Sequence, residues 1–191
     1  MAVPAHDLCM SESEYFELEE SSQVRHEYVA GRIWSMVGAS ARHGVIVSNL
    51  NHHIYEPIRQ AGCRAYATDM KVKVEASQSF YYPDLVVSCE RFDPKSNFLV
   101  APCLIVEVLS PSTQIVDRRE KLTAYRHIPS LTEYVLVYQD KMQIEVYRKD
   151  NAGSWHCQLF SKAGKLILQS VSSSEIELDM KDIYFGTELP D

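Results

Sequence analysis

The sequence predicts a mixed α/β domain whose central sheet is largely antiparallel. Apolar side chains recur at helical spacing over residues 41–60, which indicates a long amphipathic helix. Residues 103–109 form a continuous apolar run that only Glu107 interrupts, which is typical of a buried central strand. Shorter apolar or alternating runs surround this strand, and turn residues separate them. Helices and strands therefore follow one another along a single chain.

In the N-terminal half we expect two helices and several short strands. Residues 11–20 resemble a short acidic helix with Ser11 or Ser13 as its N-cap. Residues 27–37 resemble a hairpin that is interrupted at Ala30-Gly31, and the helix 41–60 ends close to Gly62. The strand candidates that follow are residues 64–67, 70–75 and 81–89. Apolar and polar residues alternate over 70–75, so one face of that strand should contact water.

In the C-terminal half a strong turn signal at residues 93–97 precedes the central strand. Residues 110–113 end that strand and lead into a helix around 115–126, with Pro129 beyond it. Residues 133–138 and 143–148 are further strands, joined by 139–141. Residues 155–160 and 165–168 resemble a final hairpin that turns at 162–164. We see no linker that would divide the chain.

Length and composition favour a globular protein outside the membrane. The chain has 191 residues, of which 46% are hydrophobic, and this suits one domain with a sizeable core. No apolar run approaches the ~20 residues that span a bilayer. Residues 1–9 lack an apolar signal core. We therefore expect a cytoplasmic protein that does not contact a membrane.

The distribution of charge leaves nucleic-acid binding open. The net charge is −7, but residues 7–20 carry six acidic and no basic residues, and residues 175–191 carry six acidic residues and Lys181. The ends thus carry eleven net negative charges, and the remainder is positive by four. A mildly basic middle permits phosphate binding, and an ordinary solvated surface is the alternative interpretation.

The five cysteines argue against a zinc cluster, because no two of them have CxxC spacing. We expect all five to be reduced thiols, most of them in packing roles. They are Cys9, Cys63, Cys89, Cys103 and Cys157.

Two carboxylates stand out in apolar strands. Glu107 is costly to bury unless a cation compensates it, and Asp84 opens the apolar run 84–89. An antiparallel register centred between Lys95 and Ser96 would place Asp84 opposite Glu107, with Cβ atoms ~4.5–5.5 Å apart. Oxygen ligands of this kind favour Mg²⁺ or Mn²⁺. The alternative is a turn or cap role for Asp84 and an internal salt bridge for Glu107.

The sequence around this pair resembles the Uma-two family of restriction-type endonucleases, within the PD-(D/E)XK nuclease superfamily. The resemblance covers residues 12–185 as one domain, with 1–11 and 186–191 as terminal extensions. It rests on these residues: Pro83-Asp84, Ile105 to Ser112, Asp117, Lys121, Tyr125, Glu27 before Gly31, Met36 before Gly38-Ala39-Ser40, His43 and Glu133-Tyr134. It implies a restriction-endonuclease-like core, with a central mixed sheet flanked by helices.

The resemblance further implies hydrolysis of DNA, with Mg²⁺ or Mn²⁺ held by Asp84, Glu107 and the Val108 carbonyl. The superfamily lysine belongs two residues after the second carboxylate, and here that position is Leu109. The resemblance assigns the role to Lys121 instead, and we expect its amine roughly 3–6 Å from a carboxylate oxygen of the cleft. It also implies a homodimer. A catalytically inactive binding or assembly module with the same fold is the alternative function.

Further candidates surround these residues. Asp117, Lys121 and Tyr125 are spaced by four and share one helix face, so Asp117 could steer the lysine. Glu27 could be a third acid near the metal or an ordinary strand-end glutamate. His43 could act as a base or bond a ligand, or it could be a satisfied helix histidine. Arg118 and Arg119 are expected to be solvated or to contact phosphate.

Overall fold

The computed structural model describes residues 9–36, 38–67, 69–111, 114–162, 164–171 and 175–189. Its centre is a six-stranded sheet with the strand order β11-β10-β9-β8-β6-β3. All its pairings are antiparallel except that of β8 with β9, which confirms the predicted, largely antiparallel central sheet. The strands are β3 (Arg64–Ala67), β6 (Leu85–Ser88), β8 (Pro102–Leu109), β9 (Glu133–Tyr138), β10 (Gln143–Lys149) and β11 (Trp155–Ser161).

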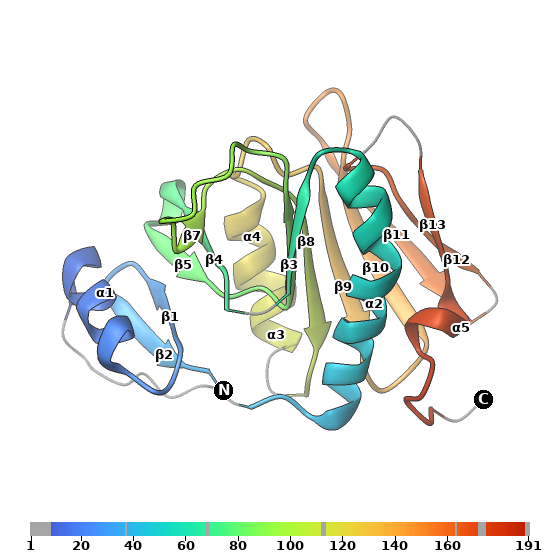
Figure 1. The fold of residues 1–191 in the computed structure, drawn as a ribbon, viewed down its shortest axis with the longest axis horizontal. Coiled ribbons are helices and arrows are strands. Elements are labelled where there is room, and N and C mark those ends of the chain that lie inside the picture. The colour runs from blue at the N-terminus through green and yellow to red at the C-terminus, as the bar shows by residue number, and fades with distance from the viewer. Residues whose placement is uncertain are drawn as a thin grey trace.

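Helices cover the two faces of this sheet (Figure 1). The long helix α2 (Ala41–Gln60) packs on one face, where Ile46, Leu50 and Ile54 join a core with alternate residues of β8 and β9. The other face carries a continuous helical segment made of α3 (Gln114–Val116), a π-helical turn η2 (Asp117–Lys121) and α4 (Leu122–Tyr125). This segment is the crossover that the parallel β8–β9 pairing requires.

β8 is buried on both sides, as its apolar run predicts. Side chains alternate between the two faces of a strand. Leu104, Val106 and Val108 join the core beneath α2, whereas Ile105 and Leu109 join the core beneath α4. Glu107 falls in the second set and therefore projects toward the helical segment.

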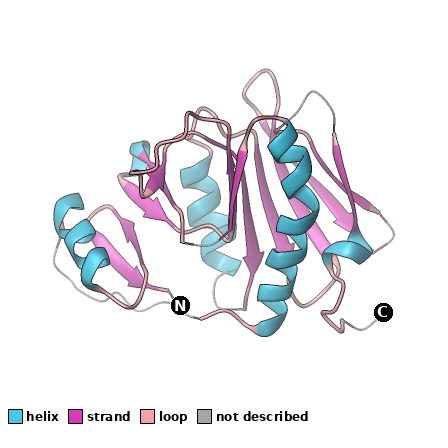
Figure 2. Cartoon of the chain, in the orientation of Figure 1, coloured by secondary structure: helices cyan, strands magenta, loops and turns pink. Residues whose placement is uncertain are grey.

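A second, five-stranded sheet with the order β2-β1-β5-β4-β7 lies beside the first (Figure 2). The helix α1 (Glu12–Ser21) begins at Ser11, whose capping box with Glu14 confirms the predicted N-cap. Tyr15 of α1 packs against Tyr28 and Phe80 of the sheet. The elements are β1 (His26–Val29), β2 (Arg32–Ser35), β4 (Lys71–Val74), a 3-10 turn η1 (Glu75–Ser77), β5 (Ser79–Tyr81) and β7 (Phe98–Leu99).

The predicted strand 81–89 is two strands that belong to different sheets. β5 ends at Tyr81 and β6 begins at Leu85, and Tyr82-Pro83-Asp84 connects them. Pro83 has no N–H with which to continue a strand ladder, so the chain leaves one sheet here and enters the other. This division places Asp84 at the start of a central strand.

The prediction that one face of 70–75 contacts water is wrong at Lys71, although Glu75 at the end of that face is exposed. Lys71 is only 6% exposed, and its ammonium lies over the rings of Phe16 and Tyr82. It donates a hydrogen bond to the Tyr82 hydroxyl at 3.2 Å. Burial lowers the pKa of Lys71 from its ordinary value. Phe16 of α1 therefore covers Lys71, a position that the alternating pattern predicts to be in contact with water.

The predicted hairpin between 155–160 and 165–168 does not form. β11 pairs with β10, whereas β12 (Lys165–Leu168) pairs with β13 (Ile176–Asp179) in a separate two-stranded sheet, followed by α5 (Met180–Ile183). Leu166 and Leu168 join Ile176 and Leu178 in the core on the α2 side of the central sheet. Burial of this apolar face explains the pairing of β12 with β13.

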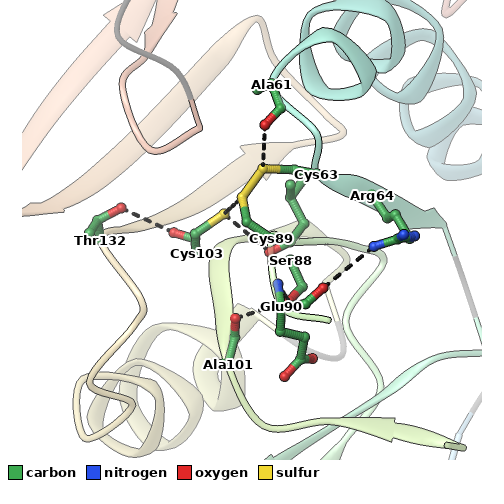
Figure 3. The surroundings of a disulfide bond; sticks show 10 residues. Ala61, Cys63, Arg64, Ser88, Cys89, Glu90, Ala101, Cys103 and Thr132 are labelled. Carbon is green, nitrogen blue, oxygen red and sulfur yellow. Dashed lines mark hydrogen bonds between the residues drawn. A yellow bond between two sulfur atoms is a disulfide. The ribbon is translucent and has the colours of Figure 1, made fainter. Parts of the chain in front are cut away.

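The expectation of five reduced thiols is wrong, because Cys63 and Cys89 form a disulfide (Figure 3). β3 pairs with β6 so that Arg64 lies opposite Ser88, and one further step places Cys63 opposite Cys89. Sequence separation hides this proximity, which the strand pairing creates. In the part of the chain that the structure describes, no helix has the length and apolar character needed to cross a bilayer.

Candidate functional site

Asp84 and Glu107 occupy the same end of two neighbouring central strands. Leu85 pairs with Val106 in the antiparallel β6–β8 ladder, and the next step of this register places Asp84 opposite Glu107. This is the register that the sequence predicted, and the bulge in the ladder affects only its other end, between Val87 and Ser88. Opposite residues of such a pair project to the same face. A carboxyl separation within ~5 Å stays a prediction.

Glu107 is buried, with 4% of its surface exposed. Its Oε1 accepts hydrogen bonds from Lys121 Nζ at 3.1 Å and from the Tyr125 hydroxyl at 3.3 Å. Burial raises the pKa of Glu107 well above its ordinary value, and the nearby acids Asp117, Asp84 and Glu27 raise it further, while Lys121 opposes them. Burial therefore disfavours the charged carboxylate, and Lys121 is the cation that offsets part of this cost.

Lys121 lies where the sequence predicted, with its amine inside the site. Its Nζ lies 2.8 Å from Glu27, 3.1 Å from Glu107 and 3.3 Å from Asp117. Burial lowers the pKa of Lys121, but the carboxylates of Glu107, Glu27 and Asp117 outweigh this effect and raise the pKa well above its ordinary value. The lysine is therefore charged although it is only 6% exposed.

The π-helical turn η2 directs Asp117 and Lys121 inward together. The N–H of Leu122 bonds to the carbonyl of Asp117, five residues earlier, and both inward-facing residues are buried. Such π-helical turns are frequent at functional sites. Tyr125 follows in α4 and also reaches Glu107, so the predicted shared face is confirmed.

Asp84 is held by two donors at the edge of the site. Its Oδ2 accepts a hydrogen bond from the Val108 N–H at 2.6 Å and lies 3.1 Å from His43 Nε2. His43 is in the first turn of α2, next to the N-cap Ser40. Burial lowers the pKa of His43, but its contacts with Asp84 and the charge of Asp117 outweigh burial and raise the pKa. His43 thus lies where it orients Asp84.

Glu27 reaches the site from β1 in the other sheet. Its Oε1 contacts Lys121 and accepts the Tyr82 N–H at 3.2 Å. It therefore holds the lysine and the segment that leads to Asp84. Neither observation assigns Glu27 to a metal.

Asp84, Glu107 and the Val108 carbonyl suit a hard cation. Four carboxylates, those of Glu27, Asp84, Glu107 and Asp117, gather around Lys121 and His43, and a divalent ion would offset the excess of negative charge. Among the described residues no group of three or more His, Cys, Asp or Glu is arranged for a metal. Mg²⁺ commonly keeps several water ligands and takes only one or two carboxylates, so Asp84 and Glu107 are the carboxylates tested for that role below.

Two tyrosines that were not predicted as site residues complete the surroundings. The Tyr134 hydroxyl donates to the Asp117 carbonyl at 3.1 Å, and Lys121 Nζ lies 5.7 Å from the centre of the Tyr81 ring. A buried tyrosine needs a hydrogen-bond partner for its hydroxyl, and this is the one general rule that points to these two residues from the sequence. Arg118 instead binds Glu145 and Tyr138, and Arg119 is exposed.

Sequence comparison finds relatives that align with this chain over most of its length and most of theirs. Two relatives are uncharacterized proteins of Synechocystis sp. One, slr1290, is 36% identical over 166 residues, which are 86% of this chain and 87% of the relative. The other, sll1609, is 34% identical over 158 residues, which are 81% of this chain and 89% of the relative.

Structural comparison identifies the fold. The crystal structure of a "putative nuclease belonging to DUF820" from Anabaena variabilis superposes with a TM-score of 0.70. The match covers 90% of this chain and 96% of that one at 22% identity, which shows a shared fold. The sequence also matches the Uma2 family, described as "Putative restriction endonuclease", over residues 12–181. This chain therefore belongs to the Uma2 family and has the fold expected from that resemblance.

Proposed function

We propose that this protein is a metal-dependent endonuclease that hydrolyses phosphodiester bonds in DNA. The observation that carries the proposal is the position of Lys121. Its buried ammonium lies 3.1 Å from Glu107, although β8 has Leu109 where the superfamily pattern has a lysine. A fixed positive charge in a buried site stabilises the negative charge that develops during phosphoryl transfer. Membership of the Uma2 family supports DNA as the substrate.

Asp84, Glu107 and the carbonyl of Val108 would hold Mg²⁺ or Mn²⁺. When bound, such an ion lowers the pKa of a coordinated water and offsets charge on the phosphate. The N–H of Val108 orients Asp84, and its carbonyl would be the third ligand. His43 fixes the same Asp84 oxygen from α2.

Lys121 would act on the phosphate group. Glu27 and Asp117 hold its amine at 2.8 and 3.3 Å and keep it protonated. From this position the ammonium would stabilise charge on the non-bridging oxygens or orient the attacking water. Asp117 is thus a positioning residue, as is Glu27. A homodimer would present one such site to each strand of a duplex.

The test is cleavage of supercoiled plasmid and labelled linear duplex with Mg²⁺, with Mn²⁺ and with EDTA. We expect cleavage with either metal and none with EDTA. Asp84→Asn and Glu107→Gln should each slow cleavage by ~10²-fold or more. Glu90→Gln, at the other end of β6, is the matched control and should cut at the wild-type rate. DNA binding without cleavage in either metal would overturn the proposal in favour of a non-cleaving binding or assembly module.

A further inference from the structure

Three cysteines meet at the end of the central sheet that lies opposite the carboxylate pair (Figure 3). Cys63 directly precedes β3, Cys89 directly follows β6, and Cys103 lies near the start of β8. Cys63 and Cys89 are joined by the disulfide. The Sγ of Cys103 lies 3.8 Å from the Sγ of Cys89. Cys89 therefore has two sulfur neighbours, one bonded and one in contact.

A β-bulge positions Cys103. Val87 pairs with Leu104, but Ser88 pairs with Pro102, so Cys103 is the extra residue of β8 in this ladder. Bulges commonly redirect a side chain. The carbonyl of Cys103 accepts hydrogen bonds from the N–H and the hydroxyl of Thr132, at 3.1 and 3.2 Å, which hold the bulge in place. The third sulfur is thus set beside the disulfide by the backbone.

Both outer sulfurs have a carbonyl acceptor for the thiol state. The Cys103 thiol donates to the Val87 carbonyl at 3.4 Å. The Cys63 sulfur lies 3.6 Å from the Ala61 carbonyl, which would accept its hydrogen once Cys63 is reduced. Whichever of Cys63 and Cys103 is not bonded to Cys89 has a partner for its proton. The site can therefore hold either of two disulfides, Cys63–Cys89 or Cys89–Cys103.

Cys89 is the most exposed of the three cysteines, and a cavity lies beside its disulfide partner Cys63. Cys89 is exposed, whereas Cys63 is 7% exposed and Cys103 is half-buried. A cavity of about 440 Å³ is lined by Cys63 together with the basic side chains of Arg59 and Arg64. Its volume is in the range of small-molecule sites, ~300–1,000 Å³. Arg59 is paired with Glu56 at 2.7 Å, so Arg64 supplies the positive charge that suits a small thiol with carboxylates.

We propose that these cysteines form a thiol–disulfide exchange site in which Cys89 is shared between Cys63 and Cys103, with a small anionic thiol of the glutathione class as its redox partner. In the internal step the Cys103 thiolate attacks Cys89 Sγ. The Cys63–Cys89 bond breaks, the Cys89–Cys103 bond forms, and Cys63 leaves as a thiolate that takes the proton given up by Cys103. No electrons are gained or lost.

The glutathione step begins at Cys89, the most exposed of the three residues. A glutathione thiolate attacks Cys89, forms a mixed disulfide and releases Cys63 as a thiolate. The Cys103 thiolate then displaces glutathione and forms the Cys89–Cys103 bond, or a second glutathione does so and leaves reduced Cys89 and oxidised glutathione. Burial raises the pKa of the Cys103 thiol to about 11, so its thiolate is scarce at neutral pH and the internal exchange is slow.

The experiment maps disulfides in the full chain after equilibration with oxidised glutathione, acid quenching and alkylation. In wild type we expect the Cys63–Cys89 linkage as the main product and Cys89–Cys103 as a minor one. In Cys63→Ser the Cys89–Cys103 linkage should dominate. The double variant Cys63→Ser/Cys103→Ser should retain glutathione on Cys89 at a level about 10-fold above that of Cys63→Ser, because no neighbouring thiol displaces it.

Cys157→Ser is the matched control and should leave the wild-type map unchanged, since Cys157 lies in β11. Equal glutathione on Cys89 in the single and double variants would overturn the proposal. So would a wild-type map without the Cys89–Cys103 linkage, and this measurement needs no variant to fold. The mapping uses no DNA and no divalent metal, so its outcome is independent of the proposed nuclease activity.

Discussion

The carboxylate of Glu27 lies 2.8 Å from Lys121 Nζ, closer than the carboxylate of Glu107 at 3.1 Å. Glu27 is in β1 of the five-stranded sheet, whereas Lys121 is in the helical segment that covers the six-stranded sheet. The same glutamate oxygen accepts the N–H of Tyr82, two residues before Asp84. Glu27 therefore links the five-stranded sheet both to Lys121 and to the segment that leads to Asp84.

Glu27→Gln should impair cleavage without removing a metal ligand. The amide cannot hold the ammonium of Lys121 as a carboxylate does, so the lysine loses its nearest charged partner. Loss of such a supporting residue typically costs about 10–100-fold in activity. We expect this decrease in the plasmid-cleavage rate, with Mn²⁺ binding by calorimetry little changed. Glu20→Gln, at an exposed position of α1, is the control. A Glu27→Gln enzyme that cuts at the wild-type rate would remove Glu27 from the account.

Lys121→Ala should lower cleavage by ~10²-fold or more, because the transition-state charge loses its stabilising cation. The rate should be measured at a temperature where circular dichroism shows the variant to be folded. Lys95→Ala, in the exposed turn, should cut normally. Full activity of folded Lys121→Ala would show that the lysine does not take part in catalysis.

The same variant should also lose stability. The sequence alone suggests that Lys121→Ala leaves the fold nearly intact, since a lysine contributes little core volume. The structure corrects this, because Lys121 is buried against Glu27, Glu107 and Asp117. Removing one partner from a buried ion pair costs about 3–5 kcal/mol. Urea unfolding should show a loss of this size, and an unchanged midpoint would indicate that the carboxylates are not compensated by the lysine.

The Cys63–Cys89 disulfide should stabilise the chain against unfolding. It closes a loop between residues 26 apart, and cross-links of this length contribute about 3 kcal/mol by restricting the unfolded chain. The double variant Cys63→Ala/Cys103→Ala, in which Cys89 has no neighbouring thiol to bond, should therefore unfold at lower urea concentration than oxidised wild type. Wild type measured with a reducing agent should match the variant, and no difference between oxidised and reduced wild type would contradict the prediction.

A homodimer is expected from the family resemblance, because a twofold pair presents two sites to the two strands of a duplex. Light scattering over a range of protein concentrations, with and without duplex DNA, measures the assembly directly. The expected mass is twice the chain mass of 21.8 kDa. A mass that stays at the single-chain value at every practical concentration would refute the dimer.

Much of the site could be predicted because its geometry follows from strand pairing. A symmetric register about the turn at 93–97 placed Asp84 opposite Glu107, and the spacing of four placed Lys121 one turn after Asp117. The contact of Glu27 with Lys121 depends on the packing of one sheet against a helix on the other, and local sequence carries little information about such packing.

The errors in the predicted fold have a common physical origin. A local turn signal predicts that β12 pairs with β11. Burial of Leu166 and Leu168 instead favours its pairing with β13. The disulfide depends on the pairing of β3 with β6, which the spacing of the cysteines in the sequence does not reveal. The pairing of Arg64 with Ser88 brings Cys63 and Cys89 together, just as the pairing of β6 with β8 brings Asp84 opposite Glu107.

The most direct test of the account is a crystal structure of the protein soaked with Mn²⁺, with the ion located by anomalous scattering. The account predicts one peak between Asp84 and Glu107, at ~2.0–2.6 Å from an oxygen of each and from the Val108 carbonyl. In that structure the two carboxylates should have oxygens within ~5 Å of each other. A peak elsewhere, with Asp84 and Glu107 paired only to His43 and Lys121 at saturating Mn²⁺, would contradict the shared metal site on which the proposed nuclease activity depends.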